Sequence, residues 1–323
     1  MNIDLSKRIE EYGKKHILVI GDVMLDKYIF GKIDRVSPEA PVPVIREEKI
    51  NYNLGGAANV ARNINGLGGQ ASLIGLIGQD SAGECLKSIT NKDSIRINFD
   101  FIEDKSLQTT VKTRIIGQGQ HIARLDRESE CQSTPRITKI LKEKIRGLIN
   151  EVDGIILQDY DKGVLGEELI KFVMEKSLSQ SIPVYVDPKN KHFLLYSGAR
   201  FFKPNQFEFK KEIGYDDDVV SAGVAFRQKL NLDILMVTMS EKGMYLFQEN
   251  QHTHIETKAR SVHDVSGAGD TVISTFALND ICGADPDESA FISNLAAGRV
   301  CEEIGVVPIT SSIMTEIINH HSK

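Results

Sequence analysis

The sequence predicts an α/β protein with a mainly parallel central sheet and helices on both of its faces. Two observations predict this class. Short runs rich in Ile and Val alternate with helical segments through the middle of the chain, and this order is typical of βαβ units. The run at residues 16–22, HILVIGD, is apolar up to its closing Gly-Asp, as expected of a buried strand that leads into a loop.

The other predicted elements follow in a regular order. Residues 55–69 form a glycine turn, a helix of small residues and a glycine stop, and residues 71–78 form a second strand. After residue 134 helices and strands alternate, and the last third adds a pair of strands and three helices. The strands are predicted at 154–159, 183–187, 201–205, 234–239, 243–247 and 253–257, and the helices at 134–152, 166–180, in two stretches between 206 and 233, from about 269, from about 288 and near the C-terminus.

Two segments do not fit this alternation. Residues 28–50 hold three prolines, and PVPVI within them alternates like an edge strand, where proline is tolerated. Residues 109–126 are typical of a β-hairpin that turns near 117–120. We therefore expect one α/β domain over residues 1–323, with a small inserted β lid formed by about 28–50 and 107–127.

Composition excludes several classes of function. The 323 residues carry 39 basic and 45 acidic side chains, and the net charge of −6 disfavours binding to nucleic acid. No apolar run approaches the ~20 residues that span a bilayer, and the charged N-terminus contains no apolar signal segment. The four cysteines are scattered without a CxxC pair, which argues against a disulfide framework or a zinc cluster. We expect a cytoplasmic protein with no membrane or nucleic-acid partner.

Residues 264–270, DVSGAGD, carry the clearest chemical pattern. Two glycines around an alanine leave backbone N–H groups accessible directly before an apolar helix. Unpaired amides at a helix N-terminus, together with the helix dipole, form an anion site. Asp270 then has two interpretations: an acidic first-turn residue that complements the dipole, or a general base beside a phosphate. The motif by itself does not decide between them.

DVSGAGD resembles the signature of the ribokinase family, also called the PfkB carbohydrate kinases. Three further family elements occur in the family's order: the glycine pair and asparagine of GGAAN at 55–59, the Asn-x-x-Glu motif NQFE at 205–208, and Val-Thr-x-x-x-x-Gly at 237–243. The resemblance extends over most of the chain. It implies a ribokinase-like fold and a sugar kinase that uses ATP and Mg²⁺, with a monovalent cation such as K⁺ beside the anion site.

The resemblance also implies the roles at the phosphate-transfer end. Asp270 would be the catalytic base, and the amides of Gly267, Ala268 and Gly269 would stabilise the transferred phosphoryl group. Asn205 and Glu208 would help to hold Mg²⁺ and the triphosphate through water. Without the family context, a capping box at a helix start is the favoured interpretation of Asn-x-x-Glu. The nucleotide-binding residues implied by the motifs are Asn205, Gln206, Phe207, Glu208, Thr238, Ser240 and Gly243.

The sugar end is expected to use polar groups from the first third of the chain. Asp22, Asp26 and Asn59 offer hydrogen-bond donors and acceptors for hydroxyls, next to Gly55 and Gly56. A turn residue at a strand end is a serious alternative for Asp22. Asn59 could be a polar position in a packed helix, but the two adjacent glycines favour contact with the sugar. A substrate that already bears a phosphate also needs fixed cations. The available cations are Lys112, Arg114 and Arg124 on the predicted lid, with Lys162 and Lys189.

Within the family, the chain resembles the heptose 7-phosphate kinases of ADP-heptose synthesis. The strings GDVMLDKY, RVSPEAPVPVI, NLGGAANVARN and VDPKN carry this resemblance. It implies phosphorylation of D-glycero-β-D-manno-heptose 7-phosphate at carbon 1, giving the 1,7-bisphosphate used for lipopolysaccharide core precursors, and a homodimer with paired lids. Kinases of this branch are often fused to a nucleotidyltransferase, and we expect no such domain here. The branch's usual Ser-Asp-Tyr-Gly-Lys-Gly reads Gln158-Asp159-Tyr160-Asp161-Lys162-Gly163 in this chain.

Three other functions remain open at the level of sequence. A kinase of another sugar or sugar phosphate, such as fructose 6-phosphate, would use the same motifs. A sensing protein would keep the fold and bind sugar or nucleotide without turnover. An NAD-dependent oxidoreductase is disfavoured, because the GxGxxA string at 66–71 leads from a helix into a strand, the reverse of the dinucleotide-binding order. A P-loop is excluded, because neither Gly-Lys pair is followed by Ser or Thr.

Overall fold

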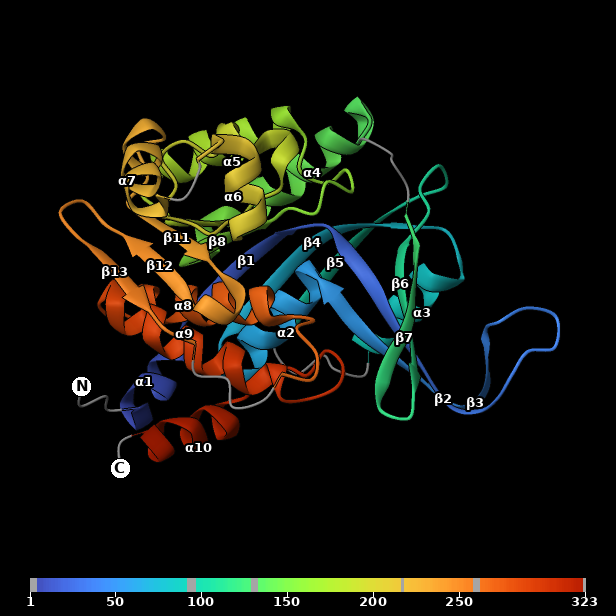
Figure 1. Cartoon of the computed structure of the whole chain (residues 1–323). Coiled ribbons are helices and arrows are strands. Elements are labelled where there is room, and N and C mark those ends of the chain that lie inside the picture. Colours follow the sequence, from blue (N-terminus) through green and yellow to red (C-terminus); the bar gives the residue numbers. More distant parts are fainter. Residues whose placement is uncertain (1–4, 92–96, 129–132, 216–217, 258–261, 322–323) are drawn as a thin grey trace.

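The computed structural model of the chain describes residues 5–91, 97–128, 133–215, 218–257 and 262–321. Within them, nine strands form one large sheet (Figure 1). They are β1 (His16–Gly21), β4 (Gln70–Gly78), β5 (Ile97–Asp104), β8 (Gly154–Gln158), β9 (Val184–Asp187), β10 (Phe201–Phe202), β11 (Ile234–Thr238), β12 (Met244–Phe247) and β13 (His252–Ile255). The order is β13-β12-β11-β10-β9-β8-β1-β4-β5, and all neighbours from β11 to β5 are parallel. The predicted α/β class is confirmed.

Helices cover both faces of this sheet (Figure 1). One face carries α4 (Pro135–Leu148), α5 (Glu167–Ser179), α6 (Gln206–Ile213) and α7 (Val219–Lys229). The other carries α1 (Leu5–Tyr12), α2 (Ala57–Gly66), α8 (Ala268–Ile281), α9 (Pro286–Cys301) and α10 (Ser311–His321). Strand β1 is apolar after His16 because its residues alternate between two cores: Ile17 and Val19 pack on the α8 side, Leu18 and Ile20 on the α4 side. Among the described residues, no helix has the length and apolar character needed to cross a membrane.

The carboxyl ends of the parallel strands meet at one edge of the sheet. Gly21, Gln158 and Asp187 close β1, β8 and β9, and they lie in register across the three strands. Because neighbours in register point to the same face, the side chains of Gln158 and Asp187 both point toward α8. Gly21 has no side chain at this row, and a Cβ there would overlap the backbone of Gln158. The first polar groups after the buried strands therefore collect under the start of α8.

A second sheet of four strands forms the predicted lid. It contains β2 (Val23–Val36), β3 (Pro43–Gly56), β6 (Thr110–Gly117) and β7 (Gln120–Arg127), in the order β3-β2-β6-β7. The hairpin with its turn at 117–120 forms as predicted. The first segment is longer and more regular than predicted, since β2 and β3 are antiparallel strands of 14 residues each. Pro43 starts an edge strand and Pro38 and Pro41 lie in the connection, so no proline removes an interior hydrogen bond.

Three elements have no counterpart in the sequence-based expectations. They are α1, α3 (Ser81–Thr90) and the edge strand β5. Helix α3 begins after Asp80, an N-cap residue type that can be recognised in the sequence. Its side chain accepts the Gly83 N–H at 2.8 Å. Strand β5 mixes charged and aromatic residues and is only partly buried, so its sequence lacks the apolar run that marks the other parallel strands.

The loop after β8 contains a strained residue where the resembled branch has glycine. Asp161 adopts φ 56°, in the left-handed region that disfavours residues with a Cβ. Its N–H donates to Asp159 Oδ1 at 2.9 Å, which helps to hold this conformation. The substitution relative to the branch therefore keeps the loop shape at a cost in backbone strain.

We predict that Asp161→Val lowers the free energy of unfolding by about 1–2 kcal/mol relative to Asp161→Gly, because a β-branched side chain is strained at positive φ. Asp161→Gly should remain close to wild type, since relief of strain offsets the added freedom of the unfolded chain. Urea unfolding of the three proteins measures both differences. Equal stability of the Val and Gly variants would contradict the left-handed conformation.

Candidate active site

Asp270 lies in the first turn of α8 and is buried. The helix starts at this point because Gly267, its N-cap, adopts φ 83°, which side-chain-bearing residues rarely do. Three groups donate hydrogen bonds to the carboxylate: Asn59 Nδ2 to Oδ2 at 2.8 Å, Tyr160 Oη to Oδ1 at 2.9 Å and Gln158 Nε2 to Oδ1 at 3.1 Å. The predicted base is thus held in one orientation by residues from α2 and from the end of β8.

Burial raises the pKa of Asp270 to about 6. The nearby negative charge of Asp187 acts in the same direction, whereas the hydrogen bonds from Asn59 and Tyr160 and the charge of Lys203 lower the pKa. A carboxylate with a pKa in this range is ionised at neutral pH and still has enough proton affinity to act as a general base.

The start of α8 has the properties of an anion site. The Gly269 N–H has no hydrogen-bond acceptor in the part of the chain that the structure describes, whereas Ala268 N–H donates to Val265 O at 3.2 Å. A Cβ at Gly269 would lie 3.4 Å from Lys203 Nζ, so this ammonium group is next to the helix start. Lys203 is buried and pairs with Asp187 at 2.9 Å. An anion placed here would meet a helix N-terminus and a fixed cation.

The loop before α8 is fixed by the first residue of the motif. Asp264 accepts the Ser266 N–H at 2.9 Å and the Gly305 N–H at 3.1 Å, and His121 of the lid lies 3.5 Å from the same carboxylate. The hydrogen bonds from Ser266 and Gly305 and the charge of His121 outweigh burial, so the pKa of Asp264 is lowered. Asp264 therefore connects the loop before α8 to the lid, and its carboxylate is engaged in these contacts rather than available as a second base.

The predicted sugar-binding residue Asp22 holds the loop after β8. Its carboxylate accepts the backbone N–H groups of Tyr160, Lys162 and Val164 at 2.8, 3.0 and 3.0 Å. These bonds place the Tyr160 hydroxyl against Asp270. Gly56, at φ 59°, lets the chain pass close to the Asp22 carbonyl, which accepts the Ala57 N–H at 3.0 Å. Asp22 therefore supports the loop that carries Tyr160, and its contact with the sugar stays a prediction.

Asp26 and Arg114 form a buried ion pair inside the lid. Arg114 also lies over the ring of Tyr28, with its Cζ 5.2 Å from the ring centroid. Gly55 faces Asp26 across the strand pair, and a Cβ at Gly55 would overlap the Asp26 carboxylate. Three predicted substrate residues, Asp26, Gly55 and Arg114, are therefore brought together at one place in the lid, where the arginine is already neutralised.

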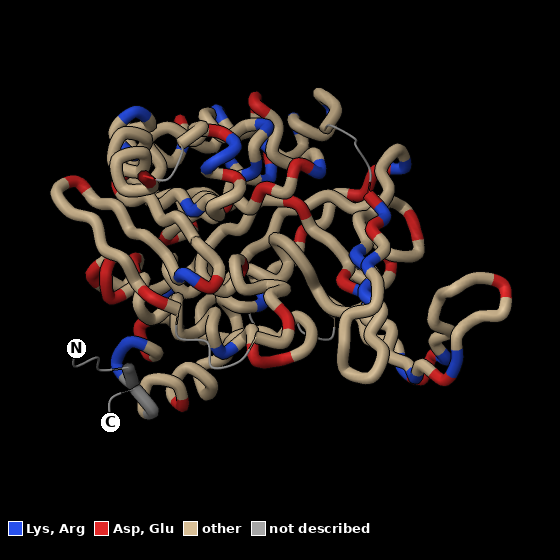
Figure 2. Tube along the Cα trace, viewed as in Figure 1, with Lys and Arg blue, Asp and Glu red and all other residues tan. Residues whose placement is uncertain are grey.

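The other predicted phosphate-binding cations also have acidic partners. Lys162 pairs with Glu128 at 2.6 Å, and Arg124 with Asp126 at 2.8 Å. Lys112 contacts both of these carboxylates, at 2.9 and 3.1 Å. Figure 2 shows acidic and basic residues next to each other along these strands. A substrate phosphate at the lid would have to compete with Asp126 and Glu128 for these cations.

Asn205 and Glu208 form the capping box that starts α6. Asn205 Oδ1 accepts the Glu208 N–H at 2.8 Å, and Glu208 Oε2 accepts the Asn205 N–H at 2.9 Å. Glu208 is buried and its other oxygen pairs with Lys189, whose Nζ lies 5.5 Å from the Tyr160 ring centroid. Every oxygen of this set has a protein partner, so direct Mg²⁺ ligation does not fit, and contact through water does. Among the described residues, no three His, Cys, Asp or Glu residues are grouped to hold a metal.

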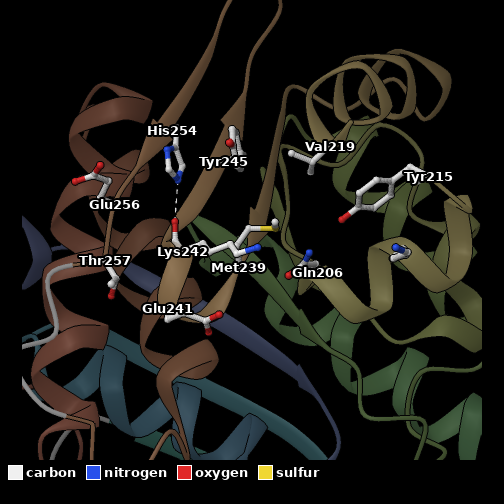
Figure 3. A pocket seen from close by; sticks show the side chains of 11 residues that line it. Gln206, Tyr215, Val219, Met239, Glu241, Lys242, Tyr245, His254, Glu256 and Thr257 are labelled. Atoms are coloured by element: carbon white, nitrogen blue, oxygen red, sulfur yellow. Dashed lines mark hydrogen bonds between the residues drawn. The ribbon is translucent and has the colours of Figure 1, made fainter. Parts of the chain in front are cut away.

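A cavity of about 550 Å³ opens beside the capping box (Figure 3). It lies between α6 and the β12–β13 pair, and Gln206 is one of its lining residues. Thr238 ends β11 and forms a bridge with Asn205, and the turn at Ser240 and Gly243 leads into β12. Phe207 is 75% exposed and does not line the cavity. The remaining lining residues are Lys210, Tyr215, Val219, Met239, Glu241, Lys242, Tyr245, His254, Glu256 and Thr257.

Four residues of the site have no role in the sequence-based predictions: Gln158, Tyr160, Asp187 and Lys203. Strand alternation could have found the first, because Ile156 lies in the core on the α8 side and Gln158 is two residues further along β8. Tyr160 and Lys203 carry no such periodic signal. Their positions depend on hydrogen bonds to Asp22 and on the ion pair with Asp187, which only the folded chain brings together.

A base with a pKa near neutrality beside an anion site can deprotonate a hydroxyl as it attacks a phosphoryl group. This fold and this site define a phosphotransferase. Residues 14–312 match the pfkB family of carbohydrate kinases. The chain belongs to this family.

Curated relatives and solved structures agree with this membership. The chain is 37% identical over 315 residues to the bifunctional protein HldE of Aliivibrio fischeri and 38% identical over 320 residues to HldE of Vibrio cholerae, matches that cover 96% and 98% of this chain. It spans only 65% and 66% of the length of these relatives. The phosphofructokinase-2 structure from Escherichia coli in complex with potassium has a TM-score of 0.79 at 18% identity, covering 96% of this chain and 99% of that one. Arabidopsis thaliana ribokinase complexed with ribose and ATP gives 0.71 at 18% identity, covering 94% and 98%.

The raised pKa of Asp270 leads to a pH prediction. If this carboxylate is the base, kcat/KM for the sugar should fall about tenfold per pH unit below about pH 6 and level off above it, because only the ionised form accepts a proton. Initial rates of ADP formation between pH 5 and pH 8 measure the profile, with circular dichroism to check that the fold persists. A rate that stays constant down to pH 5 would contradict the role of Asp270.

Proposed function

We propose that the chain phosphorylates D-glycero-β-D-manno-heptose 7-phosphate at carbon 1, with ATP as donor, to give the 1,7-bisphosphate of ADP-heptose biosynthesis. The observation that carries the kinase assignment is the buried carboxylate of Asp270 beside the anion site at the start of α8. The heptose assignment is supported by the identity to HldE proteins over almost the whole chain. It is also supported by the branch strings, of which SPEAPVPV lies at the tip of the lid.

In the proposed reaction, the hydroxyl at carbon 1 donates a hydrogen bond to Asp270 and attacks the γ-phosphorus of ATP. The new bond joins the sugar oxygen to phosphorus while the bond from phosphorus to the bridging β-phosphate oxygen breaks, and ADP leaves. Asp270 takes the proton of the hydroxyl. The amides of Gly267, Ala268 and Gly269 with the ammonium of Lys203 stabilise charge on the transferred group, and only the Ala268 N–H of the three donates to an acceptor within the described residues.

The nucleotide is proposed to occupy the cavity between α6 and the β12–β13 pair, with its phosphates directed toward α8. Mg²⁺ would neutralise charge on these phosphates when bound. Asn205 and Glu208 would contact its hydration shell, since their oxygens are already engaged in the capping box and in the pair with Lys189. For a monovalent cation such as K⁺, the support is the family membership and the potassium complex of the Escherichia coli relative.

The 7-phosphate is proposed to bind at the inner surface of the lid. Lys112 on β6 and Lys162 in the loop after β8 would contact this phosphate, and both have Glu128 as an ion-pair partner. Of the two predicted lid arginines, Arg124 is exposed, whereas Arg114 is buried against Asp26. A phosphate that displaces Glu128 would exchange one ion pair for another with two lysines, so its net gain is small unless the lid also excludes water.

We predict that Asp270→Asn lowers kcat by about 10²–10⁴-fold, because the amide cannot take the proton. The matched control is Asp233→Asn, which changes an exposed aspartate directly before β11, at the opposite end of the parallel strands from the anion site, and should keep wild-type kcat. ADP release is measured with heptose 7-phosphate, unphosphorylated heptose, fructose 6-phosphate and ribose. Near-normal kcat in Asp270→Asn would contradict the mechanism.

The same panel tests the substrate. Turnover of heptose 7-phosphate alone supports the proposal in full, and turnover of unphosphorylated heptose at an equal rate would contradict a phosphate site on the lid. Preference for fructose 6-phosphate or another sugar would keep the mechanism and replace the substrate. Binding of sugar and ATP without ADP release would favour a sensing protein.

We further propose that the chain is a cytoplasmic homodimer that pairs through its lids. The lid carries four exposed apolar side chains, Val36, Val42, Tyr52 and Leu125. Tyr52 and Leu125 line one hollow of about 360 Å³ between the face of the lid sheet and α3, whose Ser81, Ala82 and Cys85 form its other side. Its two edge strands, β3 and β7, present backbone groups that another strand or sheet can cover. In Figure 1 the β2–β3 arm extends away from the body of the molecule, which leaves this surface accessible to a second copy.

We predict that Leu125→Asp converts the dimer to a monomer, because a buried charge would oppose lid pairing. The thermal stability of the α/β core should change little. Leu178→Asp is the control, since Leu178 is 80% exposed on α5 and should leave the dimer intact. Sedimentation velocity separates the species. A wild-type chain that sediments as a monomer, or a Leu125→Asp protein that remains dimeric, would overturn lid pairing.

A further inference from the structure

Gln158 is the last residue of β8 and is completely buried. Its Nε2 donates to Asp270 Oδ1 at 3.1 Å and to Asp187 Oδ2 at 3.0 Å. Both acceptors are carboxylate oxygens, so the orientation of the amide is determined. A reversed amide would place Oε1 against two negatively charged oxygens. Gln158 therefore connects the proposed base to the end of the neighbouring strand.

The other end of this amide is unsatisfied. Gln158 Oε1 is buried and has no hydrogen-bond partner among the described residues, and the same is true of Asn59 Oδ1. An unpaired buried acceptor costs about 1–3 kcal/mol, and buried polar groups in native proteins nearly always have a partner. Two such oxygens occur beside the same carboxylate, because Gln158 donates to one oxygen of Asp270 and Asn59 to the other. This arrangement indicates a bound group that donates hydrogen bonds.

The donor is a water or a hydroxyl group of the substrate rather than an ionised phosphate. An amide oxygen only accepts hydrogen bonds, and an ionised phosphate offers none to donate. Oε1 lies no more than about 5 Å from Asp270 Oδ1. Nε2 and Oε1 are bonded to the same amide carbon, and Nε2 is hydrogen-bonded to Asp270 Oδ1. A sugar whose attacking hydroxyl faces Asp270 has its next hydroxyl one carbon away, within reach of Oε1.

We propose that Gln158 is a substrate-positioning residue whose Oε1 accepts a hydrogen bond from the sugar hydroxyl adjacent to the attacking one. The inference rests on the proposed function, and it identifies Gln158 Oε1 as a group that recognises the sugar substrate. Serine, the residue that the resembled branch has here, is too short to bridge Asp187 and Asp270 and to present an acceptor at the same point. The departure at position 158 is therefore expected to change how strictly this hydroxyl is required.

The test is a cycle between the side chain and the hydroxyl, measured by calorimetry in the absence of ATP. Heptose 7-phosphate and its 2-deoxy analogue are titrated into wild type, Gln158→Leu and Gln158→Ser. Wild type should bind the deoxy analogue about tenfold more weakly, whereas Gln158→Leu should bind both ligands with nearly equal Kd. Gln228→Leu, an exposed glutamine on α7, is the control and should keep the wild-type ratio. Gln158→Ser gives the same reading if Gln158→Leu does not fold.

The outcomes separate the inference from the proposed function. If Gln158→Leu and Gln158→Ser keep the wild-type preference for the 2-hydroxyl, the inference is wrong while the proposed function stands. If the substrate panel selects a different sugar, the cycle is run with that sugar and the analogue that lacks the hydroxyl next to the attacked one. A chain that binds ATP and none of the sugars contradicts both. Loss of discrimination in Asn59→Ser alone would assign the contact to Asn59 and overturn the role of Gln158.

Discussion

A buried carboxylate at the head of α8 is the constraint around which the site is arranged. Removing Asp270 from water is costly, and the fold compensates with hydrogen bonds from Asn59, Gln158 and Tyr160. The donors come from α2, from the end of β8 and from the following loop, so three distant parts of the chain must be in place together. The compensation is incomplete, and the remaining desolvation keeps the pKa of Asp270 near 6 rather than near its ordinary value.

The same constraint explains what several residues of the sequence motifs do within the fold. Asp22 fixes the loop that delivers Tyr160, and Gly55 and Gly56 allow β3 to pass close to Asp26 and to the end of β1. Asp264 fixes the loop before the anion site and contacts the lid through His121. These residues belong to the motifs because they set the position of the reacting groups. Motif membership alone does not distinguish a residue that touches a ligand from one that holds its neighbour.

The charged residues of the lid are arranged differently from those around Asp270. Asp126 and Glu128 pair with Lys112, Arg124 and Lys162, so these three cations are held in defined positions without ligand. Preformed pairs reduce the entropy lost when a phosphate binds, although the phosphate must displace a carboxylate. The lid also carries exposed apolar side chains, and such a surface is typical of a site of contact with another molecule.

The sequence by itself determined the α/β class, the succession of most buried strands along the chain, the lid and the motif that places Asp270 at a helix start. These features depend on local periodicity and on glycine conformations. It also predicted the family through four short motifs. It did not reveal β5, whose mixed residues reflect an edge position, or the long regular strands of the lid. Only the tertiary structure brought Gln158, Tyr160 and Lys203 to the base and paired the predicted phosphate-binding cations with acids. Those arrangements depend on contacts between residues far apart in the chain, and burial and charge pairing are properties of the folded molecule rather than of any segment.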